Sequence, residues 1–203
     1  MNAPSPAPEW LLFDYGMVIS DAPQESDWDR LQRATGLDLR HHEGPYWRSR
    51  LEFDAGRIDA AAYWSRVIGG SVPADLLAHL EELDAAQWSH LNRCTVSALE
   101  TLHSRNQRLA LLSNMPAGMA ATYSSEAGWV QYFGQLFFSG VLGMAKPDRR
   151  IFDHVLGVLG ARPEHVLFID DNDANIAAAR GLGLQTVLFR PGMDLLGILD
   201  AER

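Results

Sequence analysis

Six polar residues follow short apolar runs of this 203-residue chain, directly or after a loop. They are Asp14, Ser113, Asn114, Lys146, Asp170 and Asp171. Lys146 is the single lysine among 17 basic residues, and a compact ammonium suits a small anion in a tight site. If the apolar runs are parallel strands, their carboxyl ends share one edge of a sheet, where ligands bind. The pattern therefore predicts one site built from these residues.

The charges of this predicted site indicate its chemistry. Three carboxylates and one ammonium leave a charge of about −2, which is unfavourable in a partly dry cleft. Mg²⁺ prefers carboxylate oxygens and would restore neutrality. The metal and Lys146 could then hold an anionic group against Asp14, with Ser113 and backbone amides taking its oxygens. Asp14 would be the nucleophile, as carboxylates are in aspartyl-phosphate chemistry, and Gly16 would leave its carbonyl free for the metal.

Each of these residues also has a purely structural interpretation. Asp14 could pair with an arginine, and Lys146 could lie exposed in its loop. Ser113–Asn114 could cap a helix. Asp170–Asp171 could be acidic residues at a helix N-terminus, where the helix macrodipole stabilises negative charge. The occurrence of all four features at strand ends favours the functional interpretation.

The elements that would position the site form an α/β pattern. Continuous apolar runs are typical of parallel strands that are covered on both faces, and strand–helix alternation predicts a mostly parallel sheet. Strands are expected at Trp10–Phe13, Leu109–Leu112, Leu136–Phe138, Val166–Ile169 and Gln185–Phe189. Helical patterns lie between them at Thr95–Ser104, Ala117–Ser125, Arg149–Leu159 and Asn175–Leu182.

The connection after the first strand is far longer than the roughly 30 residues that a βαβ unit needs. It has no strand-like run, and glycines and prolines break it into short helical patterns. We therefore predict a helical insertion, or cap, at residues 21–90 and a sheet domain at residues 1–20 and 91–203. Cap aromatics and arginines could contact a substrate, but Trp47 and Trp64 are expected to belong to the small core of the cap.

Composition excludes several other classes of protein. The net charge of −9 argues against a nucleic-acid partner. The single cysteine, Cys94, excludes a disulfide framework and a Cys-based zinc cluster. The N-terminus lacks signal-peptide features, and no segment approaches the roughly 20 apolar residues of a membrane span. We therefore expect a cytoplasmic protein with no membrane partner, and the sequence leaves its oligomeric state open.

The motifs in this order resemble the haloacid dehalogenase (HAD) superfamily. The stretches that carry the resemblance are FDYGMVI, LLSN, KPDRRIF and FIDDNDANIAAA. The resemblance implies a Rossmann-like core with a helical cap and a phosphatase-like hydrolase that acts on a small phosphorylated metabolite. It implies Mg²⁺ held by Asp14, the Gly16 carbonyl and Asp171, with Asp170 acting largely through water. Ser113, Asn114 and Lys146 would contact the substrate, and Asn175 would support the acidic loop.

One position departs from this superfamily pattern. Its phosphatases usually carry a second aspartate two residues after the nucleophile, as general acid and then base, and here that residue is Gly16. The Asp-x-Gly form is similar to a subset that contains an α-D-glucose-1-phosphate phosphatase. Loss of general acid catalysis lowers the reaction rate about 10²–10⁴-fold. The loss is smaller when the leaving group has a low pKa, because it can depart without a proton. A sugar 1-phosphate or a similarly activated phosphate monoester is therefore expected as substrate, although a cap side chain or water could instead replace the acid.

Two further functions remain open at this point. A 2-haloacid dehalogenase would use the same nucleophile against carbon and needs no metal, so the pair Asp170–Asp171 favours phosphoryl transfer over it. A catalytically weak binding or scaffold protein would explain the missing acid, but the presence of Asp14 and Lys146 counts against it.

Overall fold

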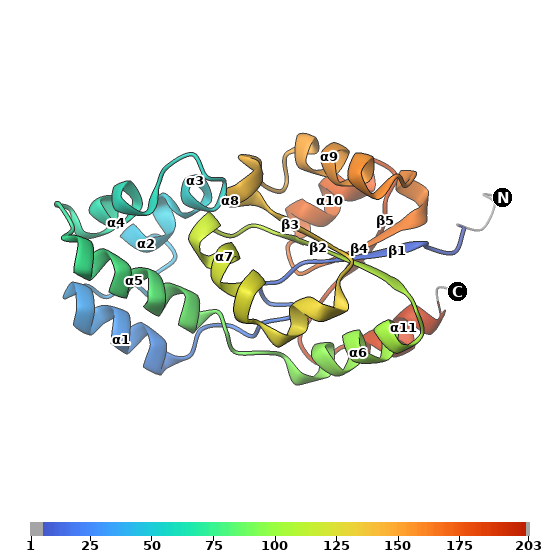
Figure 1. The fold of residues 1–203 in the computed structure, drawn as a ribbon, viewed down its shortest axis with the longest axis horizontal. Helices are drawn as coiled ribbons and strands as arrows, with labels where there is room; N and C mark the ends of the chain where they lie inside the picture. Colours follow the sequence, from blue (N-terminus) through green and yellow to red (C-terminus); the bar gives the residue numbers. More distant parts are fainter. Residues whose placement is uncertain (1–5, 202–203) are drawn as a thin grey trace.

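The computed structural model describes residues 6–201, and within them five strands form one all-parallel sheet (Figure 1). The strands are β1 (Trp10–Phe13), β2 (Arg108–Ser113), β3 (Gln135–Phe138), β4 (Val166–Asp170) and β5 (Gln185–Leu188). Their order is β3-β2-β1-β4-β5, so β1 is central and β2 and β4 flank it. Phe13 pairs with Leu111 on one side and with Ile169 on the other. The predicted α/β fold is confirmed.

Helices cover both faces of this sheet. They are α6 (Arg93–Ser104), α7 (Ala117–Glu126), η1 (Gly128–Tyr132), α8 (Ser139–Leu142), α9 (Arg149–Leu159), η2 (Pro163–His165), α10 (Asp173–Gly181) and α11 (Leu195–Ala201). Leu11 and Phe13 pack in the core on the face of α6, α7 and α11, whereas Leu12 packs with α9 and α10. Alternate side chains of β1 thus enter two hydrophobic layers, which explains why its run is apolar at every position.

The connection between β1 and α6 forms the predicted helical insertion, at the left of Figure 1. Its helices are α1 (Glu25–Thr35), α2 (Pro45–Arg48), α3 (Arg50–Asp54), α4 (Ala60–Ile68) and α5 (Ala74–Gln87). They enclose a hydrophobic core of their own, which contains Trp28, Tyr63 and Trp64. An antiparallel bridge between Ser20 and Leu91 joins the two ends of the insertion. The exact domain boundaries stay a prediction.

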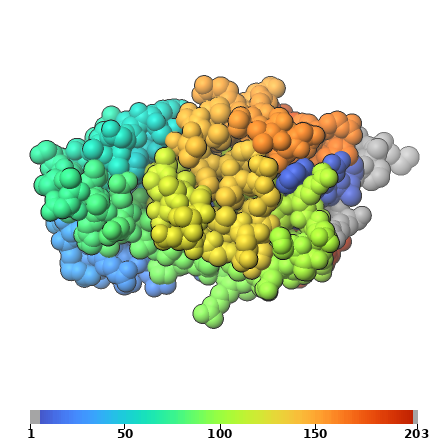
Figure 2. Space-filling model, in the orientation of Figure 1, coloured from blue at the N-terminus to red at the C-terminus, as the bar shows by residue number. Residues whose placement is uncertain are grey.

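The insertion packs against the sheet domain along α5 and α7, whose atoms adjoin in the space-filling view (Figure 2). Tyr123 on α7 donates its hydroxyl hydrogen to the Ala85 carbonyl on α5, at 2.6 Å. A second contact joins Gly56 and Gly140, where a Cβ added to Gly56 would lie 2.5 Å from the Gly140 oxygen. These contacts set the position of the cap over the carboxyl ends of the strands.

Residues 1–5 and 202–203 lie outside the described residues. Among the residues that are described, no helix has the length and apolarity to cross a bilayer.

Candidate active site

Three carboxylates meet at the carboxyl edge of the sheet. Asp14 follows β1, Asp170 ends β4 and Asp171 is the next residue. One oxygen from each lies within 4.8 Å of the others, although Asp14 is more than 150 positions from its partners in the chain. The pairing of β1 with β4 produces this proximity, because Asp14 continues the same register and donates its N–H to the Ile169 carbonyl at 2.9 Å.

Lys146 lies between two of these carboxylates. Its Nζ is 2.7 Å from Asp14 Oδ1 and 2.7 Å from Asp170 Oδ2. The side chain is buried and its ammonium lies 5.4 Å from the centre of the Phe168 ring. The alternative of an exposed loop lysine is therefore wrong, and Asp14 pairs with this lysine rather than with an arginine.

The other structural alternatives also fail. Helix α7 begins at Ala117 with Pro116 as its N-cap, so Ser113–Asn114 does not cap it. Helix α10 begins at Asp173, and its N-cap is Asn172, whose side chain accepts two backbone N–H bonds. Asp170 and Asp171 precede that cap and face the cluster instead.

Burial and repulsion shape the electrostatics of the cluster. Burial raises the pKa of the Asp14 carboxyl to about 7, Lys146 opposes this shift, and Asp170 and Asp171 add to it. The pKa of Asp171 is raised by burial and then by Asp170. Burial lowers the pKa of Lys146, but the carboxylates of Asp14 and Asp170 together have a larger opposite effect, so the pKa of Lys146 is raised. The ammonium stays charged, and the excess negative charge makes the cluster suited to a cation.

Asp170 is fully buried and fully hydrogen-bonded. Its Oδ1 accepts the N–H of Asn172 at 2.8 Å, and Asn175 Nδ2 lies 3.1 Å from both of its oxygens. Together with Lys146 these donors hold the carboxylate in one orientation. Asn175 thus makes the contact that a residue supporting the loop of Asp170 and Asp171 would make, which is the role that the family resemblance implies for it.

A cavity of about 260 Å³ opens on the cluster. The sheet domain contributes most of its walls, with Asp14, Gly16, Ser113, Asn114, Lys146, Asp171 and Asn175. Asp170 lies behind them, bonded to Lys146. Asn114 reaches the cavity, but both ends of its amide are bonded to the backbone of Lys146, at 2.9 Å each. A Cβ added to Gly16 would meet only Trp88, at 3.9 Å, so space alone does not require a glycine there.

The insertion supplies the rest of the cavity, with Trp47, Arg50, Asp54 and Trp88. The expectation of a core role is confirmed for Trp64, which is fully buried, whereas Trp47 is partly buried, packs against the cap core and also lines the cavity. Asp54 was not a predicted site residue. In the sequence, Asp54 stands out only by its spacing of four residues from Arg50, which suits an ion pair on a helix. Such pairs are common in helices that have no catalytic role.

Fold and site together define an α/β protein with an acidic cluster and a buried lysine at the carboxyl edge of its sheet, under a helical insertion. Residues 22–183 match the haloacid dehalogenase-like hydrolase family, and the chain belongs to this family.

Two individual relatives show what this chain is similar to. The chain is 46% identical over 186 residues to drimenol cyclase drtB of Aspergillus calidoustus, with 88% of this chain and 33% of that protein covered. The chain thus spans about a third of that relative. It is 26% identical to the D-ribitol-5-phosphate phosphatase of Bacteroides thetaiotaomicron, with 91% and 93% covered.

The fold is also that of known HAD structures. A HAD family enzyme from Bacteroides thetaiotaomicron, crystallised with magnesium and inorganic phosphate, superimposes with a TM-score of 0.75 at 21% identity. The match covers 94% of this chain and 98% of that one, so the insertion is part of the shared fold.

Proposed function

We propose that this chain is a Mg²⁺-dependent phosphomonoesterase that acts through an aspartyl-phosphate on Asp14. The observation that carries the proposal is the position of Asp14, which lines a small cavity between a buried lysine and two further carboxylates. A nucleophilic carboxylate, a fixed cation and a place for a metal are the parts that phosphoryl transfer to a carboxylate needs.

The cluster fits a magnesium ion. Its oxygens are close enough to share one cation, and the mutual repulsion of Asp14, Asp170 and Asp171 is what a divalent ion would relieve. Asp14, the Gly16 carbonyl and Asp171 would hold the ion, with Asp170 acting through water. When bound, the ion would neutralise charge on the phosphoryl group.

The residues of the chain perform the remaining steps. Asp14 Oδ1 accepts bonds from Lys146 and from the N–H of Tyr15, at 2.7 Å each, which fixes the orientation of the carboxylate that attacks phosphorus. Ser113 and the Lys146 ammonium bind the phosphoryl oxygens. Asn114 holds the Lys146 backbone in place and lies beside the same oxygens. Asn175 keeps Asp170 oriented toward Lys146.

The substrate is a small phosphorylated metabolite, and within this class we propose a sugar phosphate. A cavity of about 260 Å³ accepts a phosphoryl group and a small organic part. The indole rings of Trp47 and Trp88 could contact a sugar face, and a relative of similar length is a D-ribitol-5-phosphate phosphatase.

Phosphate release from a panel of phosphorylated metabolites, with Mg²⁺ and with EDTA, tests this function. The panel contains glucose 1-phosphate, glucose 6-phosphate, ribitol 5-phosphate and an isoprenoid monophosphate. We expect turnover that EDTA abolishes and that Asp14→Asn lowers by at least about 10³-fold, because the nucleophile is lost. Asp153→Asn, at an exposed ion pair on α9, is the matched control and should retain full activity.

Two outcomes would contradict the proposal. Turnover that survives in Asp14→Asn would remove the nucleophile assignment. Release of chloride from 2-chloropropionate, without turnover of any phosphate ester, would identify a dehalogenase instead.

A further inference from the structure

We propose that Asp54, at the end of α3 in the insertion, is the general acid and then the general base of the reaction, in place of the carboxylate missing at Gly16. This assignment rests on the phosphomonoesterase function proposed above. It concerns the leaving-group oxygen, which must gain a proton when its bond to phosphorus breaks.

Asp54 faces the same cavity as the nucleophile. Among the described residues, the carboxylates that line this cavity are Asp14, Asp171 and Asp54. The first two belong to the acidic cluster at the sheet edge, whereas Asp54 comes from the cap and lies outside that cluster. Its side chain is 13% exposed, so it is largely shielded but reaches the cavity. Asp54 is thus the carboxyl group that remains once the nucleophile and the metal site are assigned.

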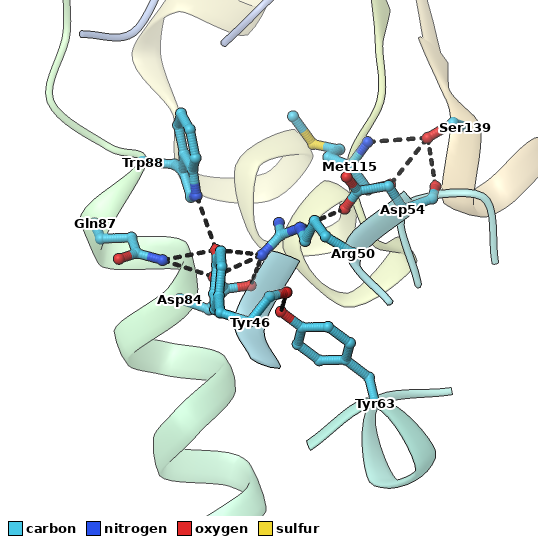
Figure 3. A network of polar contacts seen from close by, with 9 residues as sticks. All are labelled: Tyr46, Arg50, Asp54, Tyr63, Asp84, Gln87, Trp88, Met115 and Ser139. Carbon is cyan, nitrogen blue, oxygen red and sulfur yellow. Dashed lines mark hydrogen bonds and ion pairs between the residues drawn. The ribbon is translucent and has the colours of Figure 1, made fainter. Parts of the chain in front are cut away.

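The backbone of Asp54 is tied to the sheet domain, although α3 belongs to the insertion. Ser139 on α8 donates its hydroxyl hydrogen to the Asp54 carbonyl and accepts the N–H of Met115 at 2.9 Å (Figure 3). The close contact of Gly56 with Gly140 lies two residues further along the chain. Asp54 is therefore held at a set position relative to the catalytic edge, which a proton-transfer group requires.

A buried network gives the two carboxylates beside Arg50 different numbers of hydrogen-bond donors (Figure 3). Arg50 Nη1 lies 2.9 Å from both oxygens of Asp84, and Tyr46 and Gln87 donate to Asp84 Oδ1 at 2.5 and 2.8 Å. Asp54 accepts one bond, from Arg50 Nε to Oδ1 at 2.7 Å. Three side chains thus donate to Asp84, whereas the Asp54 carboxylate accepts the Arg50 bond at Oδ1, so Asp54 Oδ2 can carry a proton toward the cavity.

The resulting acidity suits proton transfer near neutral pH. Burial raises the pKa of Asp54 to about 6, Arg50 opposes the shift and Asp84 adds to it. The other side chains of the cavity are less suited. Tyr15 donates its hydroxyl hydrogen to the Trp88 carbonyl, and burial raises its pKa to about 12. Lys146 is paired with two carboxylates.

The proton then follows a closed cycle. Asp14 forms a bond to phosphorus, the bond from phosphorus to the leaving oxygen breaks, and that oxygen takes the Asp54 proton to become an alcohol. The Asp54 carboxylate next takes a proton from water while the water oxygen bonds to phosphorus. The bond between phosphorus and Asp14 breaks, which releases phosphate and restores both carboxyl groups.

The dependence of rate on the leaving group tests this assignment. For Asp54→Asn we expect kcat/KM for an alkyl phosphate from the panel to fall about 10²–10⁴-fold, as for loss of a general acid. For 4-nitrophenyl phosphate, whose phenolate leaves without a proton, the fall should stay below about tenfold. The ratio kcat/KM is used because it reports the first bond cleavage and not the later attack of water. Asp29→Asn, on the exposed face of α1, is the control.

A second measurement needs no variant. In the wild-type protein, log kcat/KM across a series of phosphate esters should depend only weakly on the pKa of the leaving group, and Asp54→Asn should make that dependence steep. Equal losses for alkyl and aryl esters, or a steep dependence in the wild-type protein, would overturn the role of Asp54. Absence of any wild-type turnover of phosphate esters would instead overturn the proposed function, and the assignment of Asp54 with it.

Discussion

Asn114 and Lys146 exchange two hydrogen bonds of 2.9 Å, in which the Asn114 amide donates to the Lys146 carbonyl and accepts the Lys146 N–H. One side chain at the end of β2 thereby fixes the loop that carries the buried ammonium. The ammonium can then bridge Asp14 and Asp170, which come from two other strands of the sheet.

Asn114→Ala should therefore act through the position of Lys146. We expect a loss of about 1–3 kcal/mol in the free energy of unfolding, because two buried backbone groups lose their partner. We also expect a fall in kcat with little change in KM. Urea unfolding and steady-state kinetics measure the two effects. A higher KM with an unchanged urea midpoint would show that Asn114 acts mainly by binding the substrate.

Magnesium should stabilise the folded protein before any substrate is present. A ligand at 100 times its dissociation constant adds about 2.7 kcal/mol to the free energy of unfolding, so Mg²⁺ should raise Tm over the value in EDTA. Asp171→Asn should remove most of this rise. Asp173→Asn, whose side chain is 80% exposed two positions away, should keep it. An equal rise in wild type and Asp171→Asn would place the metal elsewhere.

The pH profile should report Asp54. A general acid works in its protonated form, and burial raises the pKa of this carboxyl from an ordinary value near 4 to about 6. After correction for substrate ionisation, kcat/KM for an alkyl phosphate should fall about tenfold per pH unit above pH 6. The charged groups that shift the pKa of Asp54 are Arg50 and Asp84, and the other charged groups lining the same cavity are Asp14, Lys146 and Asp171.

The matched measurements are the same profile for 4-nitrophenyl phosphate and the profile of Asp54→Asn. Both should lack this descending limb. Its persistence in Asp54→Asn would assign the limb to another group.

Gly56→Ala should test the contact between cap and sheet domain. Gly56 has φ of 66°, so an L-residue costs about 1–2 kcal/mol there. The added Cβ would also lie 2.5 Å from the Gly140 oxygen, and overpacking of this kind costs about 1–3 kcal/mol more. Gly36→Ala is the control, because Gly36 has φ of 73° but no heavy atom within 4 Å of an added Cβ. Equal urea midpoints for the two variants would show that the backbone around Gly56 and Gly140 can shift to accept the added methyl group at little cost in stability.

The architecture and the edge of the sheet that holds the candidate site could be predicted from the sequence. The runs around Leu12 and Phe168 are apolar at every position, a pattern that strands buried on both faces share. Parallel strands place their carboxyl ends on one edge, so Asp14, Ser113 and Asp170 could be assigned to one site before any coordinates. These predictions depend on the periodicity of apolar residues and on the order of strands and helices, and both can be seen in the sequence.

Only the tertiary structure decided how the cap completes the cavity. Trp47 and Trp64 look alike in the sequence, but Trp64 is fully buried in the cap core, whereas Trp47 packs at the edge of that core and also lines the cavity. Asp54 resembles any helix residue spaced four from an arginine, and its burial, its single bond to Arg50 and the competition from Asp84 all depend on long-range packing. A proton affinity in a protein is set by the three-dimensional surroundings of the group, which no spacing along the chain encodes.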